Sequence, residues 1–213
     1  MSATALKIII VGGGIGGFTA GIALRQQGHR VELYEQSRFA NEIGAAIHVT
    51  PNANSVLRKH NFRVEDTGAV NLTATRLMKH SGEVLNVIDN VKEAGRWQEP
   101  WMMAHRAHLH RHLKEMATST TEPGTPVQVH TSSRVVSVDS HNSTVTLQDG
   151  TQIQGDVVVG ADGVHSVARA AIDKLQPHKT SHSAIRFMVS RESALKNDLT
   201  RELANMTGFM NMW

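Results

Sequence analysis

The feature that most constrains the fold of this chain is an apolar run near its start that passes directly into a group of glycines. The run Ile8 to Val11 lacks alternation between apolar and polar side chains, which predicts a strand covered on both faces, as in a parallel sheet. Three of the following glycines fit the pattern G-x-G-x-x-G, namely Gly12, Gly14 and Gly17. In that pattern the first glycine permits a tight turn, the second a close approach of the backbone to a pyrophosphate, and the third close packing of the next helix.

The residues around the glycines matter, because a glycine pattern alone is weak. Residues 15–27 are helix-like, and Gly28 stands where a C-terminal cap is expected. The next apolar stretch, Arg30 to Tyr34, predicts a second strand, and Glu35 follows it with a carboxylate that can accept hydrogen bonds from a ribose diol. A plain βαβ unit with a glycine-rich turn is the alternative. The full context favours a site for an adenosine diphosphate moiety without a 2′-phosphate, as in FAD or NAD.

The composition narrows the class of protein. The chain has 213 residues, of which 40% are hydrophobic and none is cysteine, so a sizeable core is possible and disulfides and thiolate metal sites are excluded. The formal net charge of +3 is modest and the basic residues are scattered, so we expect no nucleic-acid partner. No apolar run is long enough to cross a bilayer or to form the core of a signal peptide, so we expect no membrane partner and a cytoplasmic location.

The middle of the chain predicts further elements, some of them on a separate sheet. Pro51 favours a helix start, and that helix should run to about Lys59. Residues 71–90 predict a hairpin around a Ser-Gly turn. Residues 103–116 predict a helix, on which three histidines would share one face: His105, His108 and His112. Their spacing could bind a metal, but no carboxylate or cysteine completes a ligand set, so we expect no metal site.

A later strand and turn are similar to the first ones. Residues 127–153 predict four short strands in a small antiparallel meander, with an Asp-Gly turn at 149–150. Asp156 to Val159 then predict another buried parallel strand, and it ends in the run Gly160 to Arg169, with an acid at the tip of the turn. Ligands of open α/β sheets bind at the carboxyl ends of the strands, so we expect this turn to lie near the first one.

Together, four runs of residues resemble the FAD-dependent aromatic hydroxylases, which are the single-component group A flavoprotein monooxygenases. The chain is most similar to the salicylate hydroxylase-like branch found in fungal aromatic polyketide pathways. The likeness extends over residues 6 to about 170. The runs are Gly12 to Gly17 with Glu35; Gly44 to Ile47 followed by Pro51 to Ala53; His105 to Leu109; and Gly160 to Ser166 with Arg169.

The resemblance implies a fold and a set of site residues. The fold is α/β: a Rossmann-like FAD-binding domain of the para-hydroxybenzoate hydroxylase type over residues 1–175, with an inserted antiparallel meander, and the start of an incomplete substrate domain over residues 176–213. The hairpin at 71–90 would belong to the substrate-side sheet. Arg186 is the implied catalytic residue, as a contact for a phenolate. The implied cofactor-binding residues are Gly12, Gly14, Gly17, Glu35, Ala46, Arg106, Asp162 and Gly163.

The resemblance also implies a reaction. This is the hydroxylation of a small, electron-rich aromatic substrate (a phenol, an aromatic acid or a polyketide) in secondary metabolism, with FAD as cofactor and NAD(P)H and O2 as co-substrates. Family members run on much further and carry a second Gly-Asp run for the flavin ring, which this sequence lacks. We therefore expect a truncated gene product, or one whose fold a partner chain completes. The alternatives are an auxiliary, non-catalytic module that binds FAD or ADP, and a flavin-dependent reductase of related fold.

Overall fold

The computed structural model of the chain describes residues 4–39, 44–173, 175, 177–178, 180–181, 188–206 and 208–212. These residues divide into two units, and each unit combines two separate stretches of the chain. The first unit is formed by Met1–Ile43 and Leu109–His182, and the second unit by Gly44–His108 and Ser183–Trp213. The division into domains at residue 175 stays a prediction.

The first unit is built on a parallel sheet of four strands. Their spatial order is β12-β1-β2-β8, and their bounds are Lys7–Val11 for β1, Arg30–Tyr34 for β2, Gln128–His130 for β8 and Val157–Gly160 for β12. In the register of the sheet, Ile9 of β1 lies opposite Val158 on one side and Glu32 on the other. Strand β1 is almost completely buried, as expected of a central parallel strand with both faces covered. The predicted α/β class with a Rossmann-like parallel sheet is confirmed.

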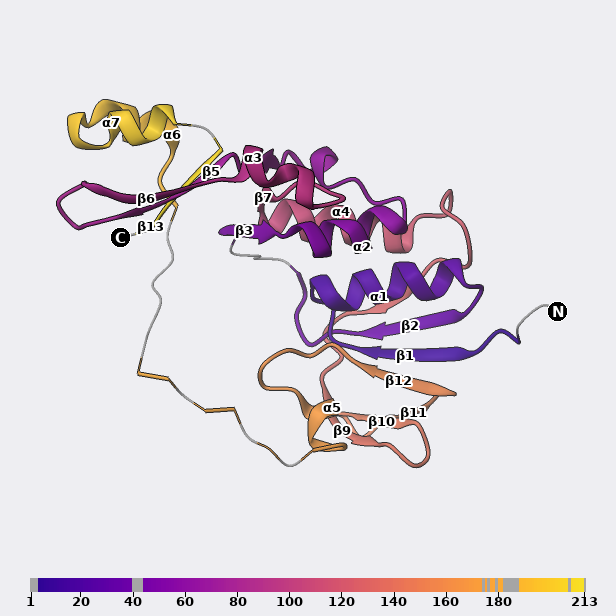
Figure 1. Ribbon diagram of the computed structural model, residues 1–213. Helices are drawn as coiled ribbons and strands as arrows, with labels where there is room; N and C mark the ends of the chain where they lie inside the picture. The colour runs from indigo at the N-terminus through magenta and orange to yellow at the C-terminus, as the bar shows by residue number, and fades with distance from the viewer. Residues whose placement is uncertain are drawn as a thin grey trace. The chain divides into compact units, whose positions relative to one another are not determined.

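Different elements cover the two faces of this sheet (Figure 1). Helix α1 (Ile15–Gln26) packs against β1 and β2 and buries Phe18 and Ile22. An antiparallel meander covers the other face, with strands β9 Val135–Asp139, β10 Thr144–Leu147 and β11 Gln152–Gln154. The core between the meander and the sheet consists of Ile9, Val11, Tyr34, Val135 and Val145.

Two further helices complete the first unit. Helix α4 (Arg106–Thr118) begins in the second unit and continues in the first, where Leu109, Leu113 and Ala117 are buried. The short helix α5 (Val167–Ala170) follows β12 and contacts both β12 and β9. It therefore stands at the carboxyl end of the parallel sheet, where the predicted second turn lies.

Two of the predicted elements were wrong, and strand pairing is the reason in both cases. Residues Met102–His105 form strand β7, antiparallel to β3 (Ala46–Val49), whereas the sequence predicted a helix from residue 103. His105 therefore does not share a helix with the other two histidines, and the described residues hold no group of three potential metal ligands. Strand β8 pairs in parallel with β2, so the meander has three strands instead of four.

The second unit contains two small sheets. In one of them β7 lies between β3 and β4 (Val70–Asn71). In the other, β5 (Ala74–Met78) pairs antiparallel with β6 (Val84–Asp89), as the predicted hairpin, and parallel with β13 (Phe209–Met212). The remaining elements are α2 Pro51–Lys59, η1 Val64–Thr67, α3 Asn90–Glu93, η2 Ala94–Arg96, α6 Arg191–Lys196 and α7 Asp198–Asn205.

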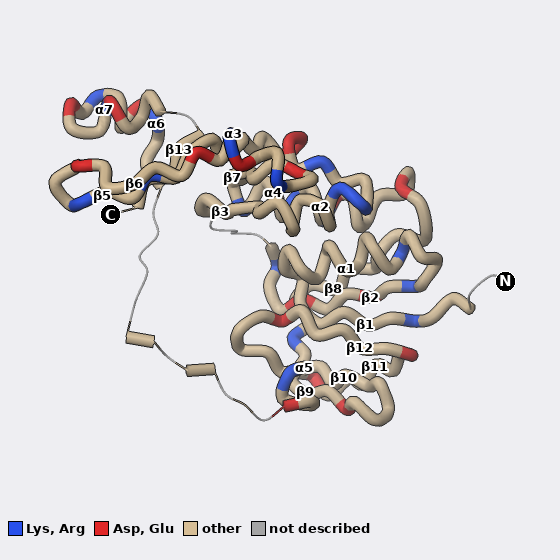
Figure 2. Tube along the Cα trace, viewed as in Figure 1, with Lys and Arg blue, Asp and Glu red and all other residues tan. Residues whose placement is uncertain are grey.

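Charged residues of both signs are interspersed along the described chain (Figure 2). Several of them pair with each other, as Lys7 does with Glu32, and Arg58 with Glu65 and Glu99. In the described part of the chain, no helix has the length and apolar composition that a membrane span needs.

Candidate nucleotide-binding site

The glycines after β1 have three different surroundings. Gly12 has a φ of +102°, and a Cβ there would lie 2.5 Å from the carbonyl oxygen of Ala161. A Cβ at Gly17 would overlap the carbonyl oxygen of Gly12. Gly14 is the N-cap of α1, and no atom outside its chain neighbours lies within 4 Å of the place of a Cβ. The first and third glycines therefore permit close packing of the turn, whereas the second leaves open space next to the backbone.

The N-terminal end of α1 carries amide groups that have no partner within the helix. The first hydrogen bond of the helix runs from the N–H of Phe18 to the carbonyl of Gly14, so the amides of the preceding turn have no partner within the helix. No acidic residue lies in this first turn. The partial positive charge of the helix end is therefore not compensated by a carboxylate of the first turn, and it can act on a bound anion such as a phosphate.

Glu35 follows β2 and is oriented by two backbone donors. Its Oε2 accepts a hydrogen bond from the N–H of Gly13 at 2.7 Å, and its Oε1 accepts one from the N–H of Ser37 at 2.7 Å. These bonds hold the carboxylate beside the glycine turn. Each oxygen keeps a further lone pair for a ligand donor such as a ribose hydroxyl.

The second predicted turn follows β12 and is stabilised from within. Asp162 Oδ1 accepts a hydrogen bond from the Ser166 hydroxyl at 2.5 Å, and Oδ2 accepts from the N–H groups of Val167 and Ala168 at 2.6 and 3.1 Å. The carboxylate therefore caps the N-terminus of α5. Gly163 has a φ of +78° and open space around it.

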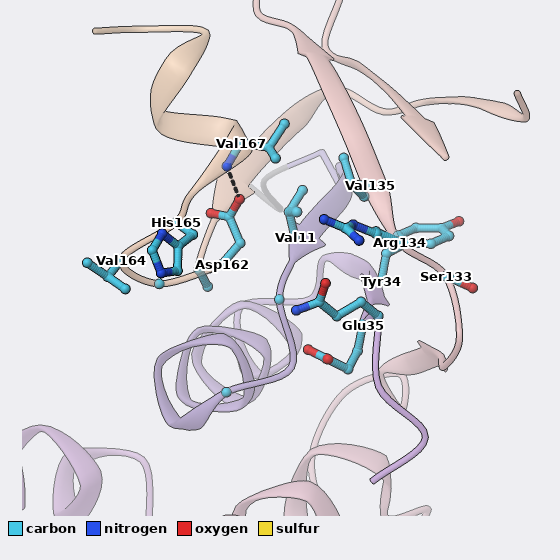
Figure 3. Close-up of a pocket in the computed structure, with 15 residues that line it drawn as sticks. Val11, Tyr34, Glu35, Ser133, Arg134, Val135, Asp162, Val164, His165 and Val167 are labelled. Atoms are coloured by element: carbon cyan, nitrogen blue, oxygen red, sulfur yellow. Dashed lines mark hydrogen bonds between the residues drawn. The ribbon is translucent and has the colours of Figure 1, made fainter. Parts of the chain in front are cut away.

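The two turns line an open cavity of about 530 Å³, a size typical of small-molecule sites (Figure 3). In Figure 3, Asp162 and His165 lie on one side of the cavity, and Glu35 and Arg134 on the other, with Val11 between them. Five predicted residues thus share one cavity, namely Gly12, Gly14, Glu35, Asp162 and Gly163. Of the remaining predicted residues, Gly17 supports the turn without lining the cavity.

The other predicted site residues lie elsewhere in the chain. Ala46 and Arg106 belong to the second unit, where Ala46 pairs with His105 and the N–H of Arg106 donates to the carbonyl of Ala45 at 2.9 Å. These two residues are therefore neighbours across the β3–β7 pair. Arg186 lies outside the described residues.

Several residues that line the cavity were not predicted as candidates. The polar ones are Tyr34, Gln36, Ser133, Arg134 and His165. Arg134 comes into the cavity because the chain before β9 runs beside β2, where the N–H of Ser133 donates to the carbonyl of Glu35 at 2.9 Å. His165 stands within the second turn. The run Gly160 to Ser166 is the sequence signal that could have pointed to His165 as a site residue. No local pattern points to Arg134.

Tyr34, which lines the cavity, belongs to a polar network that extends behind it. Its hydroxyl donates to Glu32 Oε2 at 2.7 Å, and its ring stacks on that of His130 with centroids 4.6 Å apart. Burial raises the pKa of the Tyr34 phenol, and the hydrogen bond to Glu32 raises it further. Burial acts to raise the pKa of Glu32 as well, but the hydrogen bonds from Tyr34 and Lys7 outweigh it and hold that pKa below its usual value. Glu32 is therefore an anion in the folded protein at neutral pH.

The model of a family described as an FAD binding domain matches residues 5–202. The chain belongs to this FAD-binding family. The predicted resemblance to group A FAD-dependent aromatic hydroxylases is confirmed by this match and by the relatives and solved structure below.

Two curated relatives and one solved structure illustrate the FAD-binding family. FAD-dependent monooxygenase cfoG of Aspergillus candidus is 37% identical over 198 residues, which cover 90% of this chain and 46% of that protein. Hispidin-3-hydroxylase of Neonothopanus nambi is 37% identical over 166 residues, which cover 77% of this chain and 39% of that protein. The tetrameric form of 2-methyl-3-hydroxypyridine-5-carboxylic acid oxygenase has a TM-score of 0.67 and 29% identity, covering 80% of this chain and 43% of that one. The chain thus spans less than half the length of these proteins.

The cofactor of the FAD-binding family can be tested against the cavity itself. FAD contains an adenosine diphosphate half with an anionic pyrophosphate and a ribose diol. The cavity is lined by Gly14 at the N-terminal end of α1, has open space at Gly14 and Gly163, and holds the oriented carboxylate of Glu35. These groups match a pyrophosphate and a ribose diol in charge and in hydrogen-bonding character. The described residues of the first unit therefore fit the adenosine diphosphate half of FAD.

Proposed function

We propose that this chain is the nucleotide-binding part of an FAD-dependent monooxygenase, which hydroxylates a small, electron-rich aromatic substrate with NAD(P)H and O2. Membership of the FAD-binding family supports the cofactor. The names of two similar proteins support the reaction, because one is a hispidin-3-hydroxylase and the other oxygenates a hydroxypyridine carboxylic acid. The observation that carries the proposal is the single cavity formed by the glycine turn, Glu35 and the Asp162 turn.

Each part of the cavity has a distinct role in this proposal. The amides of Gly14 and of the first turn of α1 bind the pyrophosphate, and the Glu35 carboxylate accepts hydrogen bonds from the ribose diol. Asp162 holds the second turn in place by capping α5, and the open position at Gly163 lets the cofactor approach the backbone. By resemblance, Ala46 and Arg106 contact FAD as well. When bound, FAD supplies the redox chemistry of the hydroxylation.

Further parts of the proposal rest on the resemblance alone. Arg186 binds the phenolate of the substrate. The reaction belongs to secondary metabolism. The cytoplasmic location rests instead on composition, because the sequence holds no cysteine and no apolar run of membrane-spanning length. A partner chain completes the fold at the substrate site.

Titration of the purified 213-residue chain with FAD tests the proposal. Flavin fluorescence should be quenched on binding, with saturation at one FAD per chain, and ADP should compete whereas FMN should not. Addition of NAD(P)H and a phenolic acid then tests turnover. Substrate-stimulated oxidation of NAD(P)H would support the full reaction, and FAD binding without oxidation would assign this chain the binding function alone.

A matched pair of variants locates the bound cofactor. Glu35→Gln removes the charge that orients the ribose diol and should weaken FAD binding about tenfold, which corresponds to about 1.4 kcal/mol. Glu115→Gln removes a carboxylate on the exposed side of α4 and should leave the affinity unchanged. No saturable binding of FAD or ADP by the unmodified chain would overturn the proposal.

A further inference from the structure

A buried histidine of α4 contacts the glycine turn. The side chain of His110 is 2% exposed, and its Nε2 lies 2.6 Å from the carbonyl oxygen of Gly13. A carbonyl oxygen can only accept a hydrogen bond, so Nε2 carries a hydrogen and donates it. The bond joins residues 97 positions apart in the sequence and links α4 to the turn that follows β1.

The ring of His110 is held in one orientation by two aromatic neighbours. The ring of Phe18 lies at a centroid distance of 5.1 Å and that of Phe39 at 5.2 Å. Phe39 also closes over Gly13, since a Cβ at Gly13 would lie 2.7 Å from its Cζ atom. The donor atom of His110 is therefore directed at Gly13 by packing as well as by the hydrogen bond.

Helix α4 is itself anchored to α1 by a second buried residue. Arg25 is 1% exposed, and its guanidinium donates to five carbonyl oxygens at 2.7 to 3.0 Å, those of Met116, Ala117, Ser119, Glu122 and Gly124. These carbonyls belong to the C-terminal end of α4 and the loop after it. The cation thus caps the helix end. It keeps α4 in the position from which His110 reaches the glycine turn.

Both backbone groups of Gly13 are consequently bonded to side chains. Its N–H donates to Glu35 Oε2 at 2.7 Å, and its carbonyl accepts from His110. The carbonyl of Gly13 and the N–H of Gly14 belong to one planar trans peptide, in which they point in opposite directions. A carbonyl held towards α4 therefore directs the N–H of Gly14 away from α4, and Gly14 lines the cavity.

We propose that His110 is a positioning residue for the phosphates of the bound nucleotide: by holding the Gly13 carbonyl, it presents the Gly14 N–H to the pyrophosphate. This inference rests on the proposed function, because it assigns His110 to the same cofactor site. It predicts that His110 affects binding of the phosphates and leaves binding of the adenosine moiety unchanged. A histidine that only filled space in the core would affect neither selectively.

Two substitutions at one position separate the donor from the shape of the ring. His110→Phe keeps an aromatic ring between Phe18 and Phe39 and removes the donor, whereas His110→Gln places an amide donor near the position of Nε2. His141→Phe, in the exposed turn between β9 and β10, is the control for loss of a histidine. The affinities of ADP and of adenosine are measured on the full chain by competition with FAD fluorescence quenching, and urea unfolding reports stability.

His110→Phe should weaken ADP binding about tenfold and change adenosine binding less than twofold, and His110→Gln should restore ADP binding to within about threefold of the unmodified chain. Equal weakening of ADP and adenosine, unchanged ADP binding in His110→Phe, or failure of His110→Gln to restore it would each overturn the inference. If His110→Phe does not fold, His110→Gln compared with the unmodified chain decides, since the inference requires it to bind ADP. Failure of the unmodified chain to bind ADP would overturn the proposed function and this inference together, whereas the other outcomes leave the proposed function intact.

Discussion

At the scale of single residues, the phenol of Tyr34, which lines the cavity, and the carboxylate of Glu32 stabilise each other through a hydrogen bond. Tyr34 donates to Glu32, and Lys7 forms an ion pair with the same carboxylate at 3.2 Å. Because these partners hold the pKa of Glu32 below its usual value in the folded protein, they stabilise the fold only while the carboxylate is ionised. The contribution is therefore present above the unfolded-state pKa, which is about 4.3, and is lost as the pH falls through the lower folded-state pKa.

Substitution of Tyr34 by Phe should show this pH dependence. The variant keeps the ring that stacks on His130 and loses the hydroxyl donor, so it should be about 1.5 to 3 kcal/mol less stable than the unmodified chain at pH 7. The difference between the two proteins should shrink as the pH is lowered from about 5 towards 3, because Glu32 becomes protonated in both. Urea unfolding at a series of pH values measures it.

A second substitution provides the control for this prediction. In a Glu32→Gln background the carboxylate is absent, so the Tyr34→Phe substitution should have an effect that does not vary between pH 7 and pH 3. A stability difference that stays constant with pH when Glu32 is present would show that the phenol does not act through the carboxylate.

At the scale of elements, the sequence predicted what is locally encoded and missed what depends on pairing. Helix α2 has the predicted bounds because Pro51, a local signal, favours the first turn of a helix. Strand β7 was predicted as helix because its partner β3 lies more than fifty residues earlier, and no local signal shows that pairing. Strand β8 was placed in the meander for the same reason, because no local signal shows that it pairs with β2.

The residues of the candidate site also divide into those that local sequence predicts and those that depend on tertiary contacts. The glycine turn, Glu35 and the Asp162 turn each follow directly from a strand end, and that local context was enough to predict them. Arg134 and His110 enter the site through tertiary contacts, with β2 in one case and with Gly13 in the other. Their residue types alone do not indicate these contacts, because arginines are mostly exposed and histidines are intermediate in burial.

Arg25 joins α1 to the end of α4, and its substitution should strongly reduce the stability of the protein. Arg25→Met keeps an apolar stem of similar length and removes the donors for five carbonyls at the end of α4. We expect the free energy of unfolding to fall by about 3 kcal/mol or more, because hydrogen bonds from a charged donor contribute about 1.5 to 3 kcal/mol each. Arg30→Met, on an exposed residue at the start of β2, should change it by less than about 0.5 kcal/mol. Equal effects of the two substitutions in urea unfolding would contradict the role of Arg25.

At the scale of the whole molecule, the proposed nucleotide cavity belongs to one of the two units. Its lining comes from four stretches, residues 11–14, 34–36, 133–135 and 161–167, all of them in the first unit. A ligand that binds only the folded form of this unit stabilises it by mass action. Proteins open locally in separate cooperative segments. The amides whose hydrogen exchange is slowed by the ligand should therefore identify the elements that open together with the cavity.

Amide hydrogen exchange with ADP measures this distribution of stability. At an ADP concentration of about 100 times its dissociation constant, exchange in β1 and β12 should slow by up to about a hundredfold, and exchange in the hairpin β5–β6 of the second unit should stay unchanged. FMN at the same concentration is the control, because it lacks the adenosine diphosphate half and should protect neither unit. Slowing of both units to the same extent would show that they open as one cooperative body, since the free energy of ADP binding would then be shared by segments that do not line the cavity. Protection confined to the second unit would place the nucleotide away from Glu35 and Gly14.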